Sequence, residues 1–319
     1  MPTAPIPRVP GEPKGEPVTT DSEGALESQV TVVIATRNRR DELLRNLRHH
    51  EAPVIVVDNA STDGTAEAVS RAFPDVTVIP LMVNAGARAR TLGTEFAHTP
   101  YIAFADDDSW WAPGALARAA AVFDAHPQLG ALAGSLVVGP EEEEDPINAV
   151  LAASPLGTPP GWPGPALLGF VACGTIVRRR AFLSAGGFDD VVRFPGEEER
   201  LALDLVDDGW QVAHVADVRA HHHPSVSRDS DARRRSDLIR SRLLTALLRR
   251  RWPVVARHAG TALTTAAGWR ALAGTMPRVN AALRARRRLT PATEQALAVV
   301  RTGRPVQDAD ERRNPVRTR

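Results

Sequence analysis

The order of segments along the chain predicts an α/β fold, in which a mostly parallel sheet is covered by helices on both faces. Short apolar runs rich in β-branched residues alternate with segments of helix length. This alternation is typical of βαβ units, where each helix crosses the sheet between two parallel strands. The predicted strands are Val30–Ala35, Pro53–Asp58, Val76–Pro80 and Tyr101–Asp106.

The segments between these runs carry helix signals. Leu43, Leu44 and Leu47 recur at the spacing of one helical face, and Thr62 with Asp63 is a typical helix start. In an open parallel sheet, ligands bind beyond the carboxyl ends of the strands. The polar residues at those ends are therefore the first candidates for a functional site.

Composition limits the class of protein. The chain has 319 residues, of which 43% are hydrophobic, enough for a sizeable core. Its single cysteine, Cys173, excludes an internal disulfide and a cysteine-based metal site, and we expect it to fill a small space in the core. Residues 1–28 lack the pattern of a signal peptide and are expected to be a disordered lead. No run of 18 apolar residues occurs, so no membrane span is predicted.

The net charge of +1 hides an uneven distribution. Residues 232–319 contain 21 arginines and five acidic residues, a net charge of +16, and the rest of the chain carries −15. We expect a basic helical extension over residues 232–300 and a disordered tail over 301–319. The extension either meets an anionic membrane surface or is an arginine-rich face in solvent; no nucleic-acid partner is expected, because no recognised motif occurs. The apolar face of its first helix favours packing on the preceding domain, through Leu243, Leu244, Leu247 and Leu248.

The predicted strands deliver polar residues to one rim of the sheet. Thr36 follows the first strand, Asp58 ends the second, and Asp106, Asp107 and Asp108 end the fourth. Three adjacent carboxylates repel, and each is costly at a half-buried strand end unless hydrogen bonds, water or a cation offset the charge. A divalent cation such as Mg²⁺ or Mn²⁺ prefers such oxygens, whereas the alternative is an acidic turn in which Asp108 or Ser109 caps a helix.

Several segments, in order, resemble the motifs of the family 2 glycosyltransferases, inverting enzymes of the GT-A fold. The resemblance covers about residues 29–250 and extends to rhamnosyltransferase-like members that make cell-envelope polysaccharide. It implies a GT-A catalytic domain over residues 29–231. The matching segments are "VTVVIATRNR" (30–39), "VIVVDNASTDGT" (54–65), "NAGARARTLG" (84–93, with Thr91 where Asn is usual), "FADDD" (104–108), "AGGFDD" (185–190), "GEEERLALDLVDDGW" (196–210) and "HHHPSVS" (221–227).

The resemblance assigns the donor side of the site. It implies that Asp58 holds the nucleotide base and that Asp106 contacts the ribose. Asp108 is implied to bind Mn²⁺ or Mg²⁺, which would bridge to the diphosphate and stabilise the departing charge. Further substrate-binding residues are Thr36, Arg39, Arg90 and Asp107, the last of which could serve either the ribose or the metal.

The resemblance also places a general base at Glu198, with Glu197 as its substitute. A carboxylate here would take the proton of an acceptor hydroxyl. Two departures leave the base open: Glu stands where the family has Asp, and Arg200 stands where an acid is common. Alternatively, Glu197, Glu198 and Glu199 are only favourable charges at the start of a helix.

Two further positions complete the predicted site. One histidine after the last core strand is implied to bind the metal or the diphosphate, and His222 is chosen by spacing, with His221 and His223 as alternatives. Asp189 in "AGGFDD" is implied to grip an acceptor hydroxyl, although this segment could equally be a simple turn.

The sequence therefore predicts a metal-dependent inverting glycosyltransferase that uses a nucleoside-diphosphate sugar and a glycan, lipid-linked or small-molecule acceptor. The expected location is the cytoplasm, at the inner face of the plasma membrane where the basic helices bind it. The alternative from the altered base motif is a catalytically degenerate nucleotide-sugar-binding or assembly protein. A sugar-phosphate nucleotidyltransferase is disfavoured because no Gly-rich, Arg-containing loop follows the first strand, and dinucleotide-binding and P-loop patterns do not occur.

Overall fold

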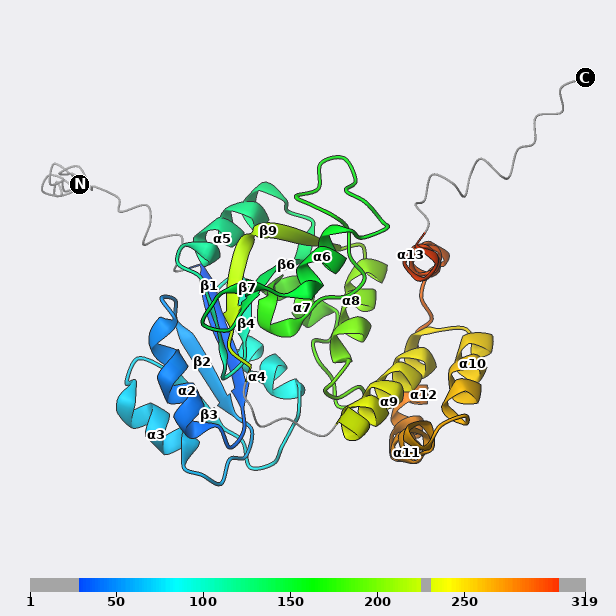
Figure 1. Cartoon of the computed structure of the whole chain (residues 1–319), viewed down its shortest axis with the longest axis horizontal. Coiled ribbons are helices and arrows are strands. Elements are labelled where there is room, and N and C mark those ends of the chain that lie inside the picture. The colour runs from blue at the N-terminus through cyan, green and yellow to red at the C-terminus, as the bar shows by residue number, and fades with distance from the viewer. Residues whose placement is uncertain (1–28, 225–230, 304–319) are drawn as a thin grey trace, which may run out of the picture.

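The computed structural model describes residues 29–224 and 231–303 (Figure 1). The predicted lead over 1–28 lies outside the described residues, as do "SVSRDS" at 225–230 and all but the first three residues of the predicted tail. Within the described part, the chain forms one mixed sheet with helices on both faces, followed by a run of helices near the carboxyl end.

The first half of the sheet is the predicted parallel unit. The strands β1 (Val30–Thr36), β2 (Val54–Asp58), β3 (Thr77–Pro80) and β4 (Tyr101–Ala105) lie in the order β3-β2-β1-β4, and all three pairs are parallel. The register sets Thr36 directly beside Asp58. The expectation that these strands end at a common rim is therefore confirmed.

The second half of the sheet mixes directions. Beyond β4 the order continues β8 (Thr175–Arg178), β6 (Leu129–Val138), β9 (Gln211–His222) and β5 (Ser109–Trp111), while β7 (Glu143–Glu144) pairs with β6. The β6–β9 pair is parallel, and β4–β8, β6–β8, β6–β7 and β5–β9 are antiparallel. β5 begins directly after the three aspartates and pairs with the end of β9. The aspartates therefore lie next to the three histidines.

Both faces of the sheet are buried, as the continuous apolar runs predict. Val32 and Ile34 of β1 face one core and Val33 faces the other. The first core contains residues of α2 (Arg40–Asn46), α3 (Thr65–Ala72), α5 (Ala115–Ala125) and the 3₁₀ turn η1 (Leu47–His49). The second contains residues of α4 (Arg88–Phe96), α6 (Pro146–Ala152), α7 (Arg179–Ser184) and α8 (Glu197–Asp207), and the 3₁₀ turn η2 (Ala172–Gly174) contributes to both.

The α4 helix lies close against β1 and β2 because of one glycine. A Cβ atom at Gly93 would come within 2.6 Å of Val33 and 3.0 Å of Val57. The last glycine of "NAGARARTLG" is thus explained by packing of helix on sheet. That close approach positions Arg90, one turn earlier, under the rim.

The predicted basic extension is helical over the described residues. It contains α9 (Asp231–Arg249), α10 (Trp252–Ala262), α11 (Ala266–Thr275), the 3₁₀ turn η3 (Met276–Arg278), α12 (Val279–Arg284) and α13 (Pro291–Thr302). Leu244 and Leu248 of α9 pack with Val192 and Ala282, so the expectation that this helix packs on the preceding domain is confirmed. None of the helices in residues 29–224 and 231–303 combines the length and apolar character needed to cross a bilayer.

Buried ion pairs join this extension to α8. Asp204, which is fully buried, accepts hydrogen bonds from Arg200 Nη1 at 2.8 Å and from Arg249 Nη2 of α9 at 2.9 Å. The guanidinium of Arg287 lies 3.6 Å from the same carboxylate. Arg249 and Arg287, which the sequence showed only as part of a basic segment, therefore share a defined anionic partner inside the protein.

We expect Asp204→Asn to lower the free energy of unfolding by about 3 kcal/mol or more, because it leaves buried guanidinium groups without their counter-charge. Asp208→Asn is the matched control: Asp208 also pairs with Arg287, at 2.5 Å, but in a partly exposed position. Its loss should cost about 1 kcal/mol or less. Urea unfolding of both variants measures the difference, and equal effects would show that the Asp204 pairs do not hold the extension in place.

Candidate active site

The rim of the sheet begins with Asp58 and the loop that follows it. Asp58 is buried, and its Oδ1 accepts a hydrogen bond from the Ser61 backbone amide at 3.0 Å. The neighbouring Asn59 donates to the Gly86 carbonyl and accepts from the Ala85 amide, at 3.0 and 2.7 Å. Asn59 thus ties the end of β2 to the "NAG" loop before α4, a role that the "DN" pair did not reveal in the sequence.

The three adjacent aspartates point to three different partners. Asp106 forms an ion pair with Arg90 of α4. Asp107 accepts a hydrogen bond from the Thr36 hydroxyl at 2.9 Å. Asp108 lies 3.5 Å from His222, measured from Oδ1 to Nε2. Mutual repulsion is therefore reduced by separate partners, and Ser109 forms a strand instead of the helix cap that was the alternative.

The pKa of Asp107 is raised to about 7. Burial is the main cause, and the charges of Asp106 and Asp108 add to it, while the Thr36 hydrogen bond and the charge of Arg39 oppose it. Arg39 itself pairs with Glu42 at 3.0 Å. The side chain of Asn46, which the sequence did not single out, donates to the Asp107 carbonyl at 2.8 Å and fixes the turn.

Arg90 connects the aspartates to the start of α8. Its guanidinium contacts Asp106 on one side and lies 3.7 Å from Glu197 on the other. Both carboxylate oxygens of Glu197 are buried without a hydrogen-bond partner among the described residues, and burial together with the charge of Glu198 raises its pKa to about 8. Glu198 is half-buried, and burial raises its pKa as well, with a further increase from Asp106. The two predicted acids are thus close to the rim but differ in exposure.

The three histidines alternate across β9. His221 stacks on Trp110 of β5 with ring centroids 5.3 Å apart, and His223 contacts the same indole at 4.7 Å. His222, between them, faces Asp108. Because successive side chains of a strand point to opposite faces, only the middle histidine is on the side of the aspartates. This geometry favours His222 over the alternatives.

Asp189 lies in the loop before α8 and has partners of its own. Its Oδ1 accepts hydrogen bonds from the amides of Val191 and Val192, both at 2.8 Å. Its Oδ2 lies 3.4 Å from Arg200, whose buried guanidinium also donates to the Gly187 carbonyl. Arg200 thus holds the "AGGFDD" loop in place. This residue departs from the family motif, and its contacts with the loop explain why an arginine is found here. The interpretation of Asp189 as part of a simple turn is favoured, and contact with an acceptor stays a prediction.

Cys173 lies in the 3₁₀ turn η2, within the core. Its thiol is buried, and its pKa is raised well above the ordinary value by burial and by the charges of Asp106, Asp108 and Glu198. Its segment, η2, contacts both β4 and β9. Cys173 is a member of the first hydrophobic core, so the expectation that it fills a small space in the core is confirmed.

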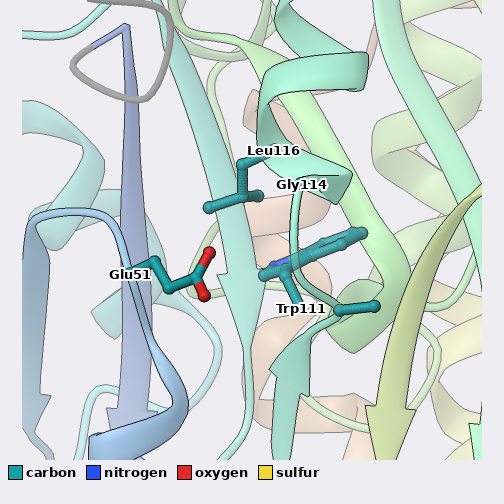
Figure 2. Close-up of a pocket in the computed structure, with 5 residues that line it drawn as sticks. Glu51, Trp111, Gly114 and Leu116 are labelled. Carbon is teal, nitrogen blue, oxygen red and sulfur yellow. The ribbon is translucent and has the colours of Figure 1, made fainter. Parts of the chain in front are cut away.

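A small pocket beside β5 is separate from the rim. It has a volume of about 10 Å³ and is lined by Trp111, Glu51 and Leu116, with the Glu51 side chain extending toward the indole (Figure 2). The Trp111 Nε1 is buried without a hydrogen-bond partner among the described residues. This volume is that of about one water molecule, so the pocket is too small for a nucleotide.

The donor atoms for a divalent cation are incomplete in the protein alone. Residues 29–224 and 231–303 contain no group of three or more His, Cys, Asp or Glu side chains placed to hold a metal ion. The pair of Asp108 and His222 supplies two donors. Mg²⁺ is commonly bound by one or two carboxylates together with substrate phosphates and water. The residues present therefore fit a cation that enters with a diphosphate, and not a closed protein site.

Comparisons with known proteins agree with this geometry. Residues 31–184 match the model of Glycosyl transferase family 2. The chain is 27% identical over 218 residues to the N-acetylglucosaminyl-diphospho-decaprenol L-rhamnosyltransferase of Mycobacterium tuberculosis (strain ATCC 25618 / H37Rv), covering 56% of this chain and 68% of the relative.

Solved structures show the same fold at low identity. The mannosyltransferase PcManGT from Pyrobaculum calidifontis, in complex with GDP-Man and Mn²⁺, has a TM-score of 0.52 and 21% identity, covering 88% of this chain and 77% of that one. Residues 1–349 of S. aureus TarS, in complex with UDP-GlcNAc, have a TM-score of 0.53 and 16% identity, covering 86% and 92%. Both similarities extend over more than four fifths of this chain.

The fold and the family match define a glycosyltransferase of the GT-A type. More narrowly, residues 31–184 match glycosyl transferase family 2, and the chain is similar to a rhamnosyltransferase.

We expect Asp107→Asn to stabilise the ligand-free protein increasingly as the pH rises. Because the pKa of Asp107 is raised in the folded state, the ionised carboxylate lowers the free energy of unfolding. This destabilisation is absent below the ordinary pKa near 3.8 and is complete above about 7. The gain in the free energy of unfolding should approach about 4 kcal/mol at pH 8, because the shift spans about three pKa units at about 1.4 kcal/mol each, and it should vanish near pH 4. Urea titrations at several pH values measure it. The control, Asp75→Asn at an exposed position, should give a difference that does not change with pH.

Proposed function

We propose that this protein transfers a sugar, with inversion, from a nucleoside-diphosphate donor to a hydroxyl of a lipid-linked acceptor. The observation that carries the proposal is the Asp106–Arg90–Glu197 bridge, which sets the acids at the end of β4 beside the acids at the start of α8. A donor-binding group and a proton acceptor are thereby close to each other. The proposed catalytic domain is residues 29–231, with residues 232–300 as its extension.

On the donor side, Asp58 would hold the nucleotide base, with Thr36 and Arg39 beside it. Asp58 is fixed by Ser61, and Thr36 is its neighbour in the sheet register. Asp106 would contact the ribose, because Arg90 holds it at the edge of the turn. These assignments follow the family motifs and are supported by the positions of the side chains around one rim.

Asp108 and His222 would hold Mn²⁺ or Mg²⁺, with the remaining ligands from the diphosphate. Bound there, the cation would supply positive charge to the departing nucleoside diphosphate. The similar mannosyltransferase from P. calidifontis was solved with both GDP-Man and Mn²⁺ bound, which supports the same choice for this chain.

The acceptor proton would go to Glu198. Its half-buried carboxylate is open to an acceptor, whereas Glu197 is fully buried behind it. As the acceptor oxygen forms its bond to the anomeric carbon, the bond to the diphosphate breaks and the hydroxyl proton moves to Glu198. Arg90 favours the ionised form of Glu198 and so keeps it able to accept the proton. Glu197 would position Arg90 and does not need to touch the substrate.

The acceptor class follows from the relative's name. That protein is called a rhamnosyltransferase acting on N-acetylglucosaminyl-diphospho-decaprenol. We infer a deoxyhexose donor and a polyprenyl-diphosphate-linked sugar as acceptor for this chain too, with a role in cell-envelope polysaccharide. Asp189 would line the acceptor side. Its Oδ2 lies 3.4 Å from Arg200, so an acceptor hydroxyl would have to share this oxygen with the guanidinium.

Glu198→Gln should reduce turnover at least a hundredfold while leaving donor affinity within about threefold, because it removes a proton acceptor but not a donor contact. Release of nucleoside diphosphate from a panel of nucleotide sugars with Mn²⁺ gives the rate, and calorimetry gives the affinity. The matched control is Glu199→Gln in the same turn. The charges near Glu199 are those of Arg242 and Arg250 in the extension, and not those of the rim, so this change should have little effect on turnover. If the wild type binds donors but releases nothing with any acceptor, the chain is a binding protein and not a transferase.

Asp108→Asn should abolish the part of nucleotide binding that depends on Mn²⁺. In the wild type, Mn²⁺ and a nucleoside diphosphate together should raise the melting temperature more than either does alone, because the cation takes ligands from both. Thermal unfolding with each component and with both measures this coupling. A wild-type shift that is the same with and without Mn²⁺ would rule out the metal role of Asp108 and His222.

A further inference from the structure

A second surface, distant from the rim in sequence, carries the features of an anion-binding groove. It lies where the start of α10 meets the segment after α12 and is lined by Arg251, Trp252, Pro253, Arg286 and Arg288. The volume of the groove is about 520 Å³. Three of its five lining residues are arginines, and none of the family motifs includes any of them.

One of these arginines is fixed by the fold. Arg286 donates hydrogen bonds to the carbonyls of Leu247 and Arg250 at the end of α9. Its guanidinium also lies over the Trp252 ring, 4.3 Å from the centroid, a cation–π contact that holds the indole in place. Trp252 nevertheless remains 57% exposed. The groove therefore presents a rigid positive charge next to an accessible aromatic ring.

The other two arginines are exposed and have no ion pair with any residue that the structure describes. Arg251 precedes α10 and Arg288 follows α12. By contrast, Arg250, next in sequence to Arg251, forms a bidentate pair with Glu294 at 2.9 and 2.8 Å. The extension thus separates its arginines into those that hold helices together and those whose charge faces outward.

The surrounding segment has no negative charge to neutralise these arginines. Residues 251–293 contain eight arginines and neither Asp nor Glu. The same helices expose apolar side chains that the core does not use, namely Leu263, Trp269, Met276 and Leu283. Arginine beside exposed tryptophan and aliphatic residues is typical of surfaces that lie in the headgroup region of an anionic bilayer.

We propose that this groove binds the phosphate of an anionic phospholipid and docks the protein on a membrane. Arg251 and Arg288 supply charge to the phosphate, and Trp252 enters the interface beside it. The same helices also expose aliphatic side chains such as Leu263 and Met276, which a bilayer interface would bury and a nucleic acid would leave in water, so a bilayer is the occupant that we propose. The proposal stands on this groove alone and does not depend on the assignments at the rim.

The test is flotation of the full chain with vesicles of phosphatidylcholine alone or with 30% phosphatidylglycerol. We expect binding only to the anionic vesicles, with loss at high salt. Arg251→Glu with Arg288→Glu should weaken binding at least tenfold, and Trp252→Ala should weaken it severalfold. The matched control, Arg45→Glu with Arg71→Glu, makes the same change of charge on exposed positions of α2 and α3 and should have little effect.

Thermal unfolding in the absence of vesicles checks that each variant is folded, and the melting temperature should be unchanged in all of them. Equal binding to neutral vesicles, or equal losses in the groove variant and the control, would overturn the proposal. So would tighter binding of single-stranded DNA than of anionic vesicles, or suppression of vesicle binding by millimolar inorganic phosphate at constant ionic strength. Because flotation needs no catalysis, failure of the proposed transferase activity would leave this result unaffected.

Discussion

The buried guanidinium of Arg90 is the contact on which the arrangement of acids depends. Asp106 follows a strand of the sheet and Glu197 begins a helix 91 residues later in the sequence. Without a cation between them, the half-buried carboxylate of Asp106 and the buried carboxylate of Glu197 would repel. Arg90 reaches both because α4 lies directly on β1 and β2, which the missing side chain of Gly93 allows. The packing of a helix on a sheet thus determines whether the acids proposed for the donor side and for the acceptor side can share one site.

A similar logic applies to the arginines of the extension. Asp204 fixes Arg200 and Arg249 in the interior, and Arg200 in turn holds the carbonyl of Gly187 and the carboxylate of Asp189. The helices near the carboxyl end are therefore part of the support of the loop before α8. Buried pairs of this kind are more valuable for fixing one arrangement than for raising stability, since desolvation offsets much of their attraction. By contrast, Arg251 and Arg288 of the groove form no ion pair with any residue that the structure describes and do not hold helices together.

The sequence predicted the parallel half of the sheet because each strand there is a short β-branched run with helix-length neighbours. It did not predict that β8, β6 and β5 pair antiparallel, since runs such as Thr175–Arg178 have no feature that sets direction. The motifs identified Asp106, Asp108 and the glutamates, but the Arg90 bridge joins residues far apart along the chain and leaves no local pattern. The choice among three histidines was open until β5 paired with β9 and placed Trp110 against His221. Arg200 appeared as a departure from a motif, and only its buried partners explain it.

The pKa values of Asp107 and Glu197 are raised first by burial and then by the charges of neighbouring acids, around a rim that has Arg90 as its buried cation. In the ligand-free protein, protonation relieves part of this repulsion near neutral pH. A nucleoside diphosphate adds further negative charge to the same place, so its binding is unfavourable unless positive charge enters with it. Two donors, Asp108 and His222, lie 3.5 Å apart in the same rim. An acidic rim of this kind is better suited to take up donor and cation together than to hold either one alone, and the protons released from the acids would then accompany binding.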